Sequence, residues 1–296
     1  MKTASKTKPV KEKPDVNALI TDKFIEAIEK GVSPFITPWS TAFGMPRNCS
    51  GRCYRGINFF LTLLYCQEFD WDIPVFMTYK QAKENGWQVR EGEKSVKVSF
   101  SSLYVPKEYK ANPSACPREL QRFYRRLYSV FNVSQIEGVD LESFVPSTFE
   151  FEPIETANRI VDGYENGPPI SHSGGRAYYS PSLGSVTLPA IKNFHASTGY
   201  YEVLFHELAH STGHPDRLAR EFGKMGTTEY AFEELVAELT ASFLCAESGF
   251  LDATFENSAS YLASWLEHFK SDNTYLIKAA SKAQLAADHI LGRSFN

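Results

Sequence analysis

The sequence predicts a two-domain α+β protein, with an N-terminal α+β domain and a mainly helical C-terminal domain that carries a small sheet. The 296 residues are enough for two domains that each bury a core. Short alternating runs typical of strands lie mostly in the first half, whereas long helical runs dominate the second. An acidic, proline-punctuated stretch at 141–155 is interpreted as the linker between domains at 15–140 and 156–296.

The two halves carry opposite net charges. Residues 1–145 contain 21 Lys and Arg residues against 16 Asp and Glu residues, and the rest of the chain holds the other 10 of 31 basic and 19 of 35 acidic residues. A basic half joined to an acidic half indicates that the first binds a polyanion while the second has another role.

Composition also indicates a cellular compartment. Residues 1–14 form a polar, basic tail that we expect to be disordered, with no apolar segment typical of a secretory signal and no membrane-spanning run further on. The five cysteines are an odd number without a disulfide-framework spacing, which favours the reducing cytoplasm. Cys49 and Cys53 lack the second pair of ligands that a zinc knuckle needs, so we interpret them as plain thiols.

The first half should begin with an amphipathic helix over 15–30, whose apolar stripe comprises Leu19, Ile20, Phe24, Ala27 and Ile28. A loop rich in Arg, Asn and Gly at 46–58 precedes a buried helix over 59–66. Alternation and β-branched residues then predict strands at 75–79, 87–90, 95–100 and 128–133, with a helix at 80–84. Between the last two strands, 107–126 is interpreted as a polar excursion.

Aromatic and basic residues alternate through this half. Rings can stack on the bases of a single-stranded nucleic acid while Lys and Arg contact its phosphates. The candidate DNA-binding residues are Trp39, Arg52, Tyr54, Arg55, Asn58, Tyr79, Lys80, Trp87, Lys94 and Arg125. Composition by itself favours the alternative, in which the aromatics belong to the core and the charges form a solvated face.

The second half is expected to surround one short hairpin with helices. Helical runs lie at 155–164, 231–245, 259–269 and 274–291, and a hairpin at 177–189 should turn at Leu183–Gly184. A strand placed just before the next helix could hold an extended peptide by edge pairing.

That next helix contains His206-Glu-Leu-Ala-His210, which matches H-E-x-x-H. On a helix the two histidines lie one turn apart on one face, so both rings can reach one zinc ion. Glu207 can take a proton from a metal-bound water. The opposite face is apolar, which indicates that the helix is buried and that its polar residues serve a purpose.

A third ligand should come from the helical run at 231–245. Glu234 and Glu238 share one face among apolar residues, and such an acid pair is costly unless a metal or a histidine compensates it. We therefore expect His206, His210 and Glu234 to hold one divalent ion, zinc or alternatively manganese, with Glu238 accepting from a ligand histidine.

Other ligands stay open at this point. Glu229 and Glu233 lie near Glu234 in the sequence, and Asp216 completes H-E-x-x-H-x-x-G-x-x-D, although that geometry leaves the buried acid pair unexplained. His214 follows Gly213, which should end the helix, so we place it in a loop. Candidates for stabilising an oxyanion are Tyr178, Tyr179 and Tyr230.

Eight short segments follow one another along nearly the whole chain: 54–58 (YRGIN), 78–82 (TYKQA), 92–94 (GEK), 130–133 (VFNV), 177–181 (AYYSP), 206–214 (HELAHSTGH), 233–238 (EELVAE) and 279–284 (AASKAQ). Together, in this order, they resemble the ArdC-type antirestriction proteins of conjugative plasmids. Residues 107–116 do not match.

This resemblance implies a non-specific single-stranded-DNA-binding N-terminal domain and a zincin-like metalloprotease C-terminal domain with an unknown protein substrate. It further implies protection of incoming plasmid DNA, with the host restriction-modification machinery as a partner, and it leaves the third ligand open. Two other classes are weighed: a DNA-binding protective protein whose metal site is structural, and a metal-dependent nuclease. Nucleases usually gather several carboxylates around Mg²⁺, which makes the last the weakest.

Overall fold

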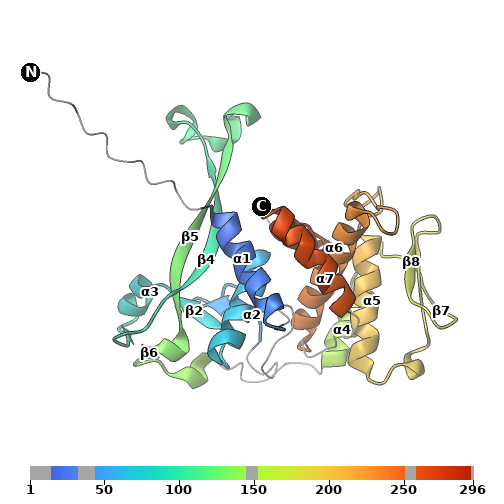
Figure 1. Cartoon of the computed structure of the whole chain (residues 1–296), viewed down its shortest axis with the longest axis horizontal. Coiled ribbons are helices and arrows are strands. Elements are labelled where there is room, and N and C mark those ends of the chain that lie inside the picture. The colour runs from blue at the N-terminus through green and yellow to red at the C-terminus, as the bar shows by residue number, and fades with distance from the viewer. Residues whose placement is uncertain (1–14, 33–43, 145–152, 251–257, 295–296) are drawn as a thin grey trace, which may run out of the picture.

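The computed structural model describes residues 15–32, 44–144, 153–250 and 258–294 (Figure 1). The basic tail, Trp39 and most of the expected linker lie outside these residues. Helix α1 spans Val16–Glu29, and the carboxylate of Asp15 caps it by accepting from the backbone N–H of Asn17 at 2.9 Å. Ile20, Phe24 and Ala27 are buried as expected, but Leu19 is 48% exposed, so its place on the buried stripe was wrong.

The N-terminal half combines short helices with a mixed sheet. Its elements are β1 (Arg47–Asn48), α2 (Ile57–Phe69), β2 (Val75–Met77), α3 (Tyr79–Glu84), β3 (Gln88–Val89), β4 (Val96–Tyr104), β5 (Arg122–Asn132) and β6 (Ile136–Glu137). Four strands form a sheet in the order β1-β2-β5-β4, and β3 pairs with β6. Helix α2 is buried along nearly its whole length, which agrees with its continuous apolar sequence.

Strands β4 and β5 form a hairpin that extends beyond the rest of the protein (Figure 1). The antiparallel ladder runs from the Val96–Val130 pair to the Tyr104–Arg122 pair. The expected excursion at 107–126 was therefore too long, because 122–126 belong to β5. Arginines there hid the strand pattern, since cross-strand backbone bonds, which a local pattern does not reveal, hold the ladder. Three 3₁₀ turns form the tip, at Lys107–Tyr109, Pro113–Ala115 and Arg118–Leu120.

The C-terminal half consists of five helices among the described residues and a three-stranded sheet. They are α4 (Pro153–Asp162), β7 (Ile170–His172), β8 (Tyr178–Ser180), β9 (Ser185–Leu188), α5 (Ser197–Ser211), α6 (Thr228–Ser248), α7 (Ser258–Ser271) and α8 (Tyr275–Ile290). The expected hairpin is β8–β9, and β7 adds to it in parallel to give the order β7-β9-β8. Strand β8 is therefore a sheet edge.

The largest hydrophobic cluster includes residues of both halves, so the two halves pack against each other through apolar side chains. The ring of Phe243 in α6 lies 4.9 Å from the rings of both Phe59 and Phe60 in α2. The backbone N–H of Gly56 donates to Oε1 of Gln284 in α8 at 2.9 Å. A second, smaller cluster around Val75 and Val133 lies within the first half. The boundaries at 15–140 and 156–296 stay a prediction.

None of the described helices combines the length and the apolar character that a membrane span requires. The described cysteines, which are all five, are free thiols.

Candidate metal centre

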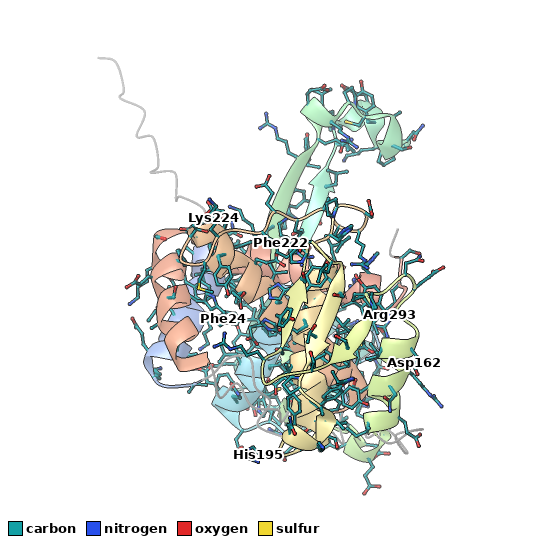
Figure 2. All side chains as sticks on the ribbon, turned by 90° about the vertical axis from the view of Figure 1, so that its right-hand side faces the viewer. Phe24, Asp162, His195, Phe222, Lys224 and Arg293 are labelled. Carbon is teal, nitrogen blue, oxygen red and sulfur yellow. The ribbon has the colours of Figure 1, made fainter. Side chains whose placement is uncertain are left out.

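Helix α5 carries the H-E-x-x-H residues, and helix α6 packs along it. Apolar side chains such as Leu204, Phe205 and Leu208 bury α5 in the core. His206 and His210 then face α6. The loop that connects α5 to α6 begins at the C-terminal end of α5. Figure 2 locates this loop through the labelled Phe222 and Lys224.

Two imidazoles and one carboxylate converge between these helices. Nε2 of His206 and Nε2 of His210 are 3.1 Å apart, and each lies 3.6 Å from an oxygen of Glu234. Their ligand atoms all lie within 4.8 Å of one another. Two ligands at 2.0–2.1 Å from a tetrahedral zinc ion lie roughly 3.4 Å apart, so this spacing fits a shared ion closely.

The outer nitrogen of each ring meets a second carboxylate. Nδ1 of His206 lies 3.3 Å from Glu238, and Nδ1 of His210 lies 3.2 Å from Glu233. A carboxylate can only accept, so Nδ1–H donates and Nε2 faces the centre in both rings. The Glu238 contact is the one expected from the sequence. The sequence predicted Glu233 only as an alternative ligand and not as a hydrogen-bond partner of His210.

The facing nitrogens need a cation, whether a proton or a metal ion. Burial opposes a charge on His206, but the carboxylates of Glu238 and Glu234 outweigh it and raise the pKa of His206 well above its ordinary value. Burial likewise opposes ionisation of Glu234, but hydrogen bonds from His206 and Tyr230 and the charges of both histidines lower its pKa. The cluster is thus built to hold positive charge at its centre.

Arg220, from the loop between α5 and α6, completes the support of His210. Its side chain is buried, and its guanidinium donates to both oxygens of Glu233, at 2.7 and 2.9 Å. It also donates to the backbone carbonyl of Ala209 at 2.8 Å, near the end of α5. Gly223 lets this loop approach α6, because a Cβ there would lie 2.2 Å from the backbone nitrogen of Tyr230. In the sequence Arg220 is a single arginine in a polar loop, so no local pattern predicted its role at the site.

Glu233→Gln is expected to weaken metal binding about 10- to 100-fold, because a neutral amide orients and polarises His210 less well. Competition against a fluorescent zinc chelator measures the effect. Glu229→Gln is the matched control, since Glu229 is exposed in the first turn of the same helix. The change also leaves Arg220 without its buried counter-charge, so thermal melting of the metal-free protein separates lost stability from lost affinity. Wild-type affinity in Glu233→Gln would remove Glu233 from the support of the site.

Of the other candidate ligands, Asp216 and Glu229 lie apart from this cluster, whereas Glu233 contacts it through Nδ1 of His210. The Asp216 side chain is 89% exposed and lies near His214, in the turn after α5. Glu229 lies in the first turn of α6, and its side chain is exposed. Among the candidate oxyanion donors, Tyr178 is exposed and the Tyr179 hydroxyl is buried with no hydrogen-bond partner among the described residues. Tyr230 bonds Glu234 and so lies at the cluster.

Several candidate DNA-binding residues have partners within the fold. The ring of Tyr54 is buried and packs edge-on against Phe76. Arg55 forms an ion pair with Asp288 of α8. The Asn58 side chain donates to the carbonyl of Ser99 at 2.6 Å and accepts from its N–H at 2.8 Å. Each of these three side chains therefore has a structural role inside the protein, and none of them is exposed. Their role in DNA binding stays a prediction.

The remaining candidates vary in exposure. Arg52, Tyr79, Lys80 and Lys94 are exposed, although Lys80 lies 3.5 Å from Glu84. Trp87 is partly buried against Phe144. Arg125 is half-buried and donates to Asn17. Trp39 lies outside the described residues, and the DNA role of these residues stays a prediction.

Comparison with known sequences finds a match to each half. Residues 14–131 match a family described as the N-terminal domain of anti-restriction factor ArdC, and residues 155–282 match a family described as zincin-like metallopeptidase. An uncharacterised protein of Sinorhizobium fredii, y4eC, is 34% identical over 93% of this chain and 91% of its own length. The DNA primase TraC of Escherichia coli is 30% identical over 92% of this chain, which spans only 26% of that protein.

Solved structures extend the match to the whole fold. The metal-free crystal structure of the antirestriction protein ArdC from plasmid R388 superposes with a TM-score of 0.76 at 32% identity, covering 95% of this chain and all of the other. Its Mn(II)-bound structure gives the same TM-score at 34% identity, over 94% and 98% of the two chains. The chain therefore belongs to the ArdC family of plasmid antirestriction proteins, with a zincin-like metallopeptidase domain as its C-terminal half.

Proposed function

We propose that this protein is a metal-dependent peptidase that also binds single-stranded DNA without sequence preference and protects incoming plasmid DNA from restriction in the recipient cytoplasm. The observation that carries the peptidase part is the convergence of His206, His210 and Glu234, at 3.1 and 3.6 Å, beside Glu207. Family membership supports the protective role.

His206, His210 and Glu234 would hold the divalent ion, which we infer to be zinc, with manganese as the alternative that the Mn(II)-bound relative supports. Such an ion supplies an activated water and polarises a peptide carbonyl. Glu238 and Glu233 keep Nδ1 of each histidine protonated, so each Nε2 stays a ligand.

Glu207 is the proposed general base. It is buried, 8% exposed, and adjoins His206 in the helix, so its carboxylate can take the proton of the attacking water and pass it to the leaving amine. Tyr230 is the best-placed donor for the developing oxyanion, because its hydroxyl already reaches the Glu234 carboxylate. The edge strand β8, which packs beside α5, would align an extended peptide substrate by backbone pairing.

Binding of single-stranded DNA is assigned to the basic N-terminal half. Polyanion binding through phosphates predicts an affinity that falls steeply with salt. The acidic C-terminal half suits a different partner, which we take to be a protein of the recipient, such as a component of its restriction-modification machinery.

Plasmid transfer tests the protective role. A conjugative plasmid that encodes the chain should enter a restricting recipient more efficiently than the same plasmid without it, with no difference in a recipient that lacks restriction. The physical reason is that protection matters only where unmodified DNA is cut. Equal transfer into the restricting recipient would contradict the proposal, and the restriction-deficient recipient controls for general effects on conjugation.

A further inference from the structure

The two faces of the β4–β5 hairpin differ in what they contact. On one face Ser99 is buried against Asn58, and Arg125 donates to Asn17 of α1 at 3.0 Å. Side chains alternate along a strand, so the even-numbered residues of β4 and β5 project from the opposite face. At the base of the hairpin this opposite face is also buried, because Val98 belongs to the core, and it is exposed only further out. The outer part of the hairpin leaves the body of the protein (Figure 1).

The exposed outer part of this opposite face, which we call the hairpin face, combines aromatic rings with arginines. It comprises Phe100, Tyr104, Arg122, Tyr124, Arg126 and Tyr128. The ladder places Phe100 opposite Arg126 and Tyr104 opposite Arg122. The four rings are between 37% and 50% exposed. A row of large exposed rings on one face is typical of a binding surface and not of a solvated strand.

The charges select a polyanion. Residues 96–128 contain seven Lys and Arg residues against two Glu residues, and both acids lie in the tip, so β4 and β5 carry no carboxylate. The guanidinium of Arg126 lies over the ring of Tyr124 at 4.7 Å. A guanidinium that lies over a ring keeps the N–H groups at its own edge free, and they can reach a phosphate.

We propose that the hairpin face is a binding site for single-stranded DNA, with bases stacked on its rings and phosphates held by Arg122 and Arg126. This inference rests on the proposed DNA binding and names its site. Duplex DNA is disfavoured, because its bases already stack on one another and offer no open faces to the rings.

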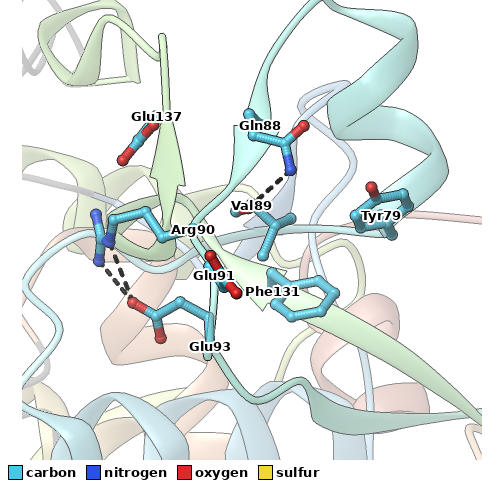
Figure 3. A pocket seen from close by; sticks show the side chains of 8 residues that line it. All are labelled: Tyr79, Gln88, Val89, Arg90, Glu91, Glu93, Phe131 and Glu137. Carbon is cyan, nitrogen blue, oxygen red and sulfur yellow. Dashed lines mark hydrogen bonds and ion pairs between the residues drawn. The ribbon is translucent and has the colours of Figure 1, made fainter.

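Two pockets on the described surface of the N-terminal half and the hairpin differ in how well they suit a polyanion. A pocket of about 710 Å³ beside Tyr79 contains Arg90, which pairs with Glu93, together with Glu91 and Glu137 (Figure 3). Three carboxylates against one paired arginine repel phosphates, so this pocket is a poor path for DNA.

A groove of about 480 Å³ on the other side of the hairpin is an alternative binding site for DNA. Arg125, Lys278 and Lys282 line it without a lining carboxylate, although Lys278 lies 3.4 Å from Asp272. It has little exposed aromatic surface besides Tyr124, which borders both regions. Tyr124 is therefore left unchanged in the test.

Fluorescence anisotropy of the full chain with a labelled oligothymidylate of about 20 nucleotides, longer than the site of one binding module, tests the proposal. Tyr104→Ala and Tyr128→Ala should each weaken binding roughly 5- to 150-fold, because each removes a ring on which a base stacks. Arg122→Gln with Arg126→Gln should reduce the slope of log affinity against log salt by about 0.7 for each phosphate that the variant no longer binds. All four residues are exposed, and circular dichroism checks that the fold is kept.

Matched controls locate the effect. Phe69→Ala removes an exposed ring at the end of α2 that stacks on Trp71, and Arg176→Gln removes an exposed arginine of the C-terminal half; both should bind as the wild type does. If the wild-type chain binds the oligonucleotide and the hairpin variants bind equally well, the hairpin inference is overturned. The same holds if Lys278→Gln with Lys282→Gln accounts for the weakened binding instead. If the wild type itself fails to bind, the proposed DNA binding fails first.

Discussion

Glu234→Ala is expected to weaken metal binding more than about 100-fold, beyond the effect of changing an outer partner of a ligand histidine. The change removes the one carboxylate that lies 3.6 Å from Nε2 of both His206 and His210. Two imidazoles alone leave the ion with too few protein ligands for a catalytic zinc site. Metal content after dialysis, together with chelator competition, measures the loss.

Two further variants make this result specific. Glu234→His keeps a ligand atom on the same helix and should retain much of the affinity, which a purely structural role of Glu234 does not predict. Asp216→Ala tests the rival geometry and should leave binding unchanged, since its side chain is exposed near His214. Loss of the ion in Asp216→Ala, with retention in Glu234→Ala, would transfer the third-ligand role to Asp216.

Glu207→Gln is expected to reduce peptidase turnover by about 10²- to 10⁴-fold, which is the usual contribution of a positioned general base. The amide is nearly the same size, so the metal should still bind, because Glu207 lies outside the group formed by His206, His210 and Glu234. Cleavage of fluorescein-labelled casein, with added zinc or manganese, is a suitable probe while the natural substrate is unidentified. Glu221→Gln, an exposed acid of the following loop, is the control.

The same variant separates the two protective mechanisms. If protection requires proteolysis, plasmids encoding Glu207→Gln should enter a restricting recipient as poorly as plasmids without the gene. Full protection by Glu207→Gln would support the alternative, in which the metal site is structural and the protein shields DNA without cutting anything. A Glu207→Gln protein that cleaves casein at the wild-type rate would refute the assignment of the base.

Local sequence patterns predicted most of the secondary structure. Helices α1, α5, α6, α7 and α8 follow the apolar periodicity of their own segments, and α2 follows a continuous apolar run. The β8–β9 hairpin follows its turn at Gly184, where φ is +61°. These features depend on near neighbours, so a local pattern suffices. The outer part of β5 was missed because its ladder partners lie about 20 residues away in β4.

By itself, the sequence determined the chemistry of the candidate site: H-E-x-x-H spacing places two imidazoles on one helical face, and buried acids on a second helix require compensation. Only the tertiary structure decided which acid does what. Glu233 and Glu234 are adjacent in the chain, but the helix turns them toward different atoms, one to Nδ1 of His210 with Arg220 and the other to both Nε2 atoms. The way in which α6 packs along α5 decides which acid meets which nitrogen, and no local pattern contains that packing.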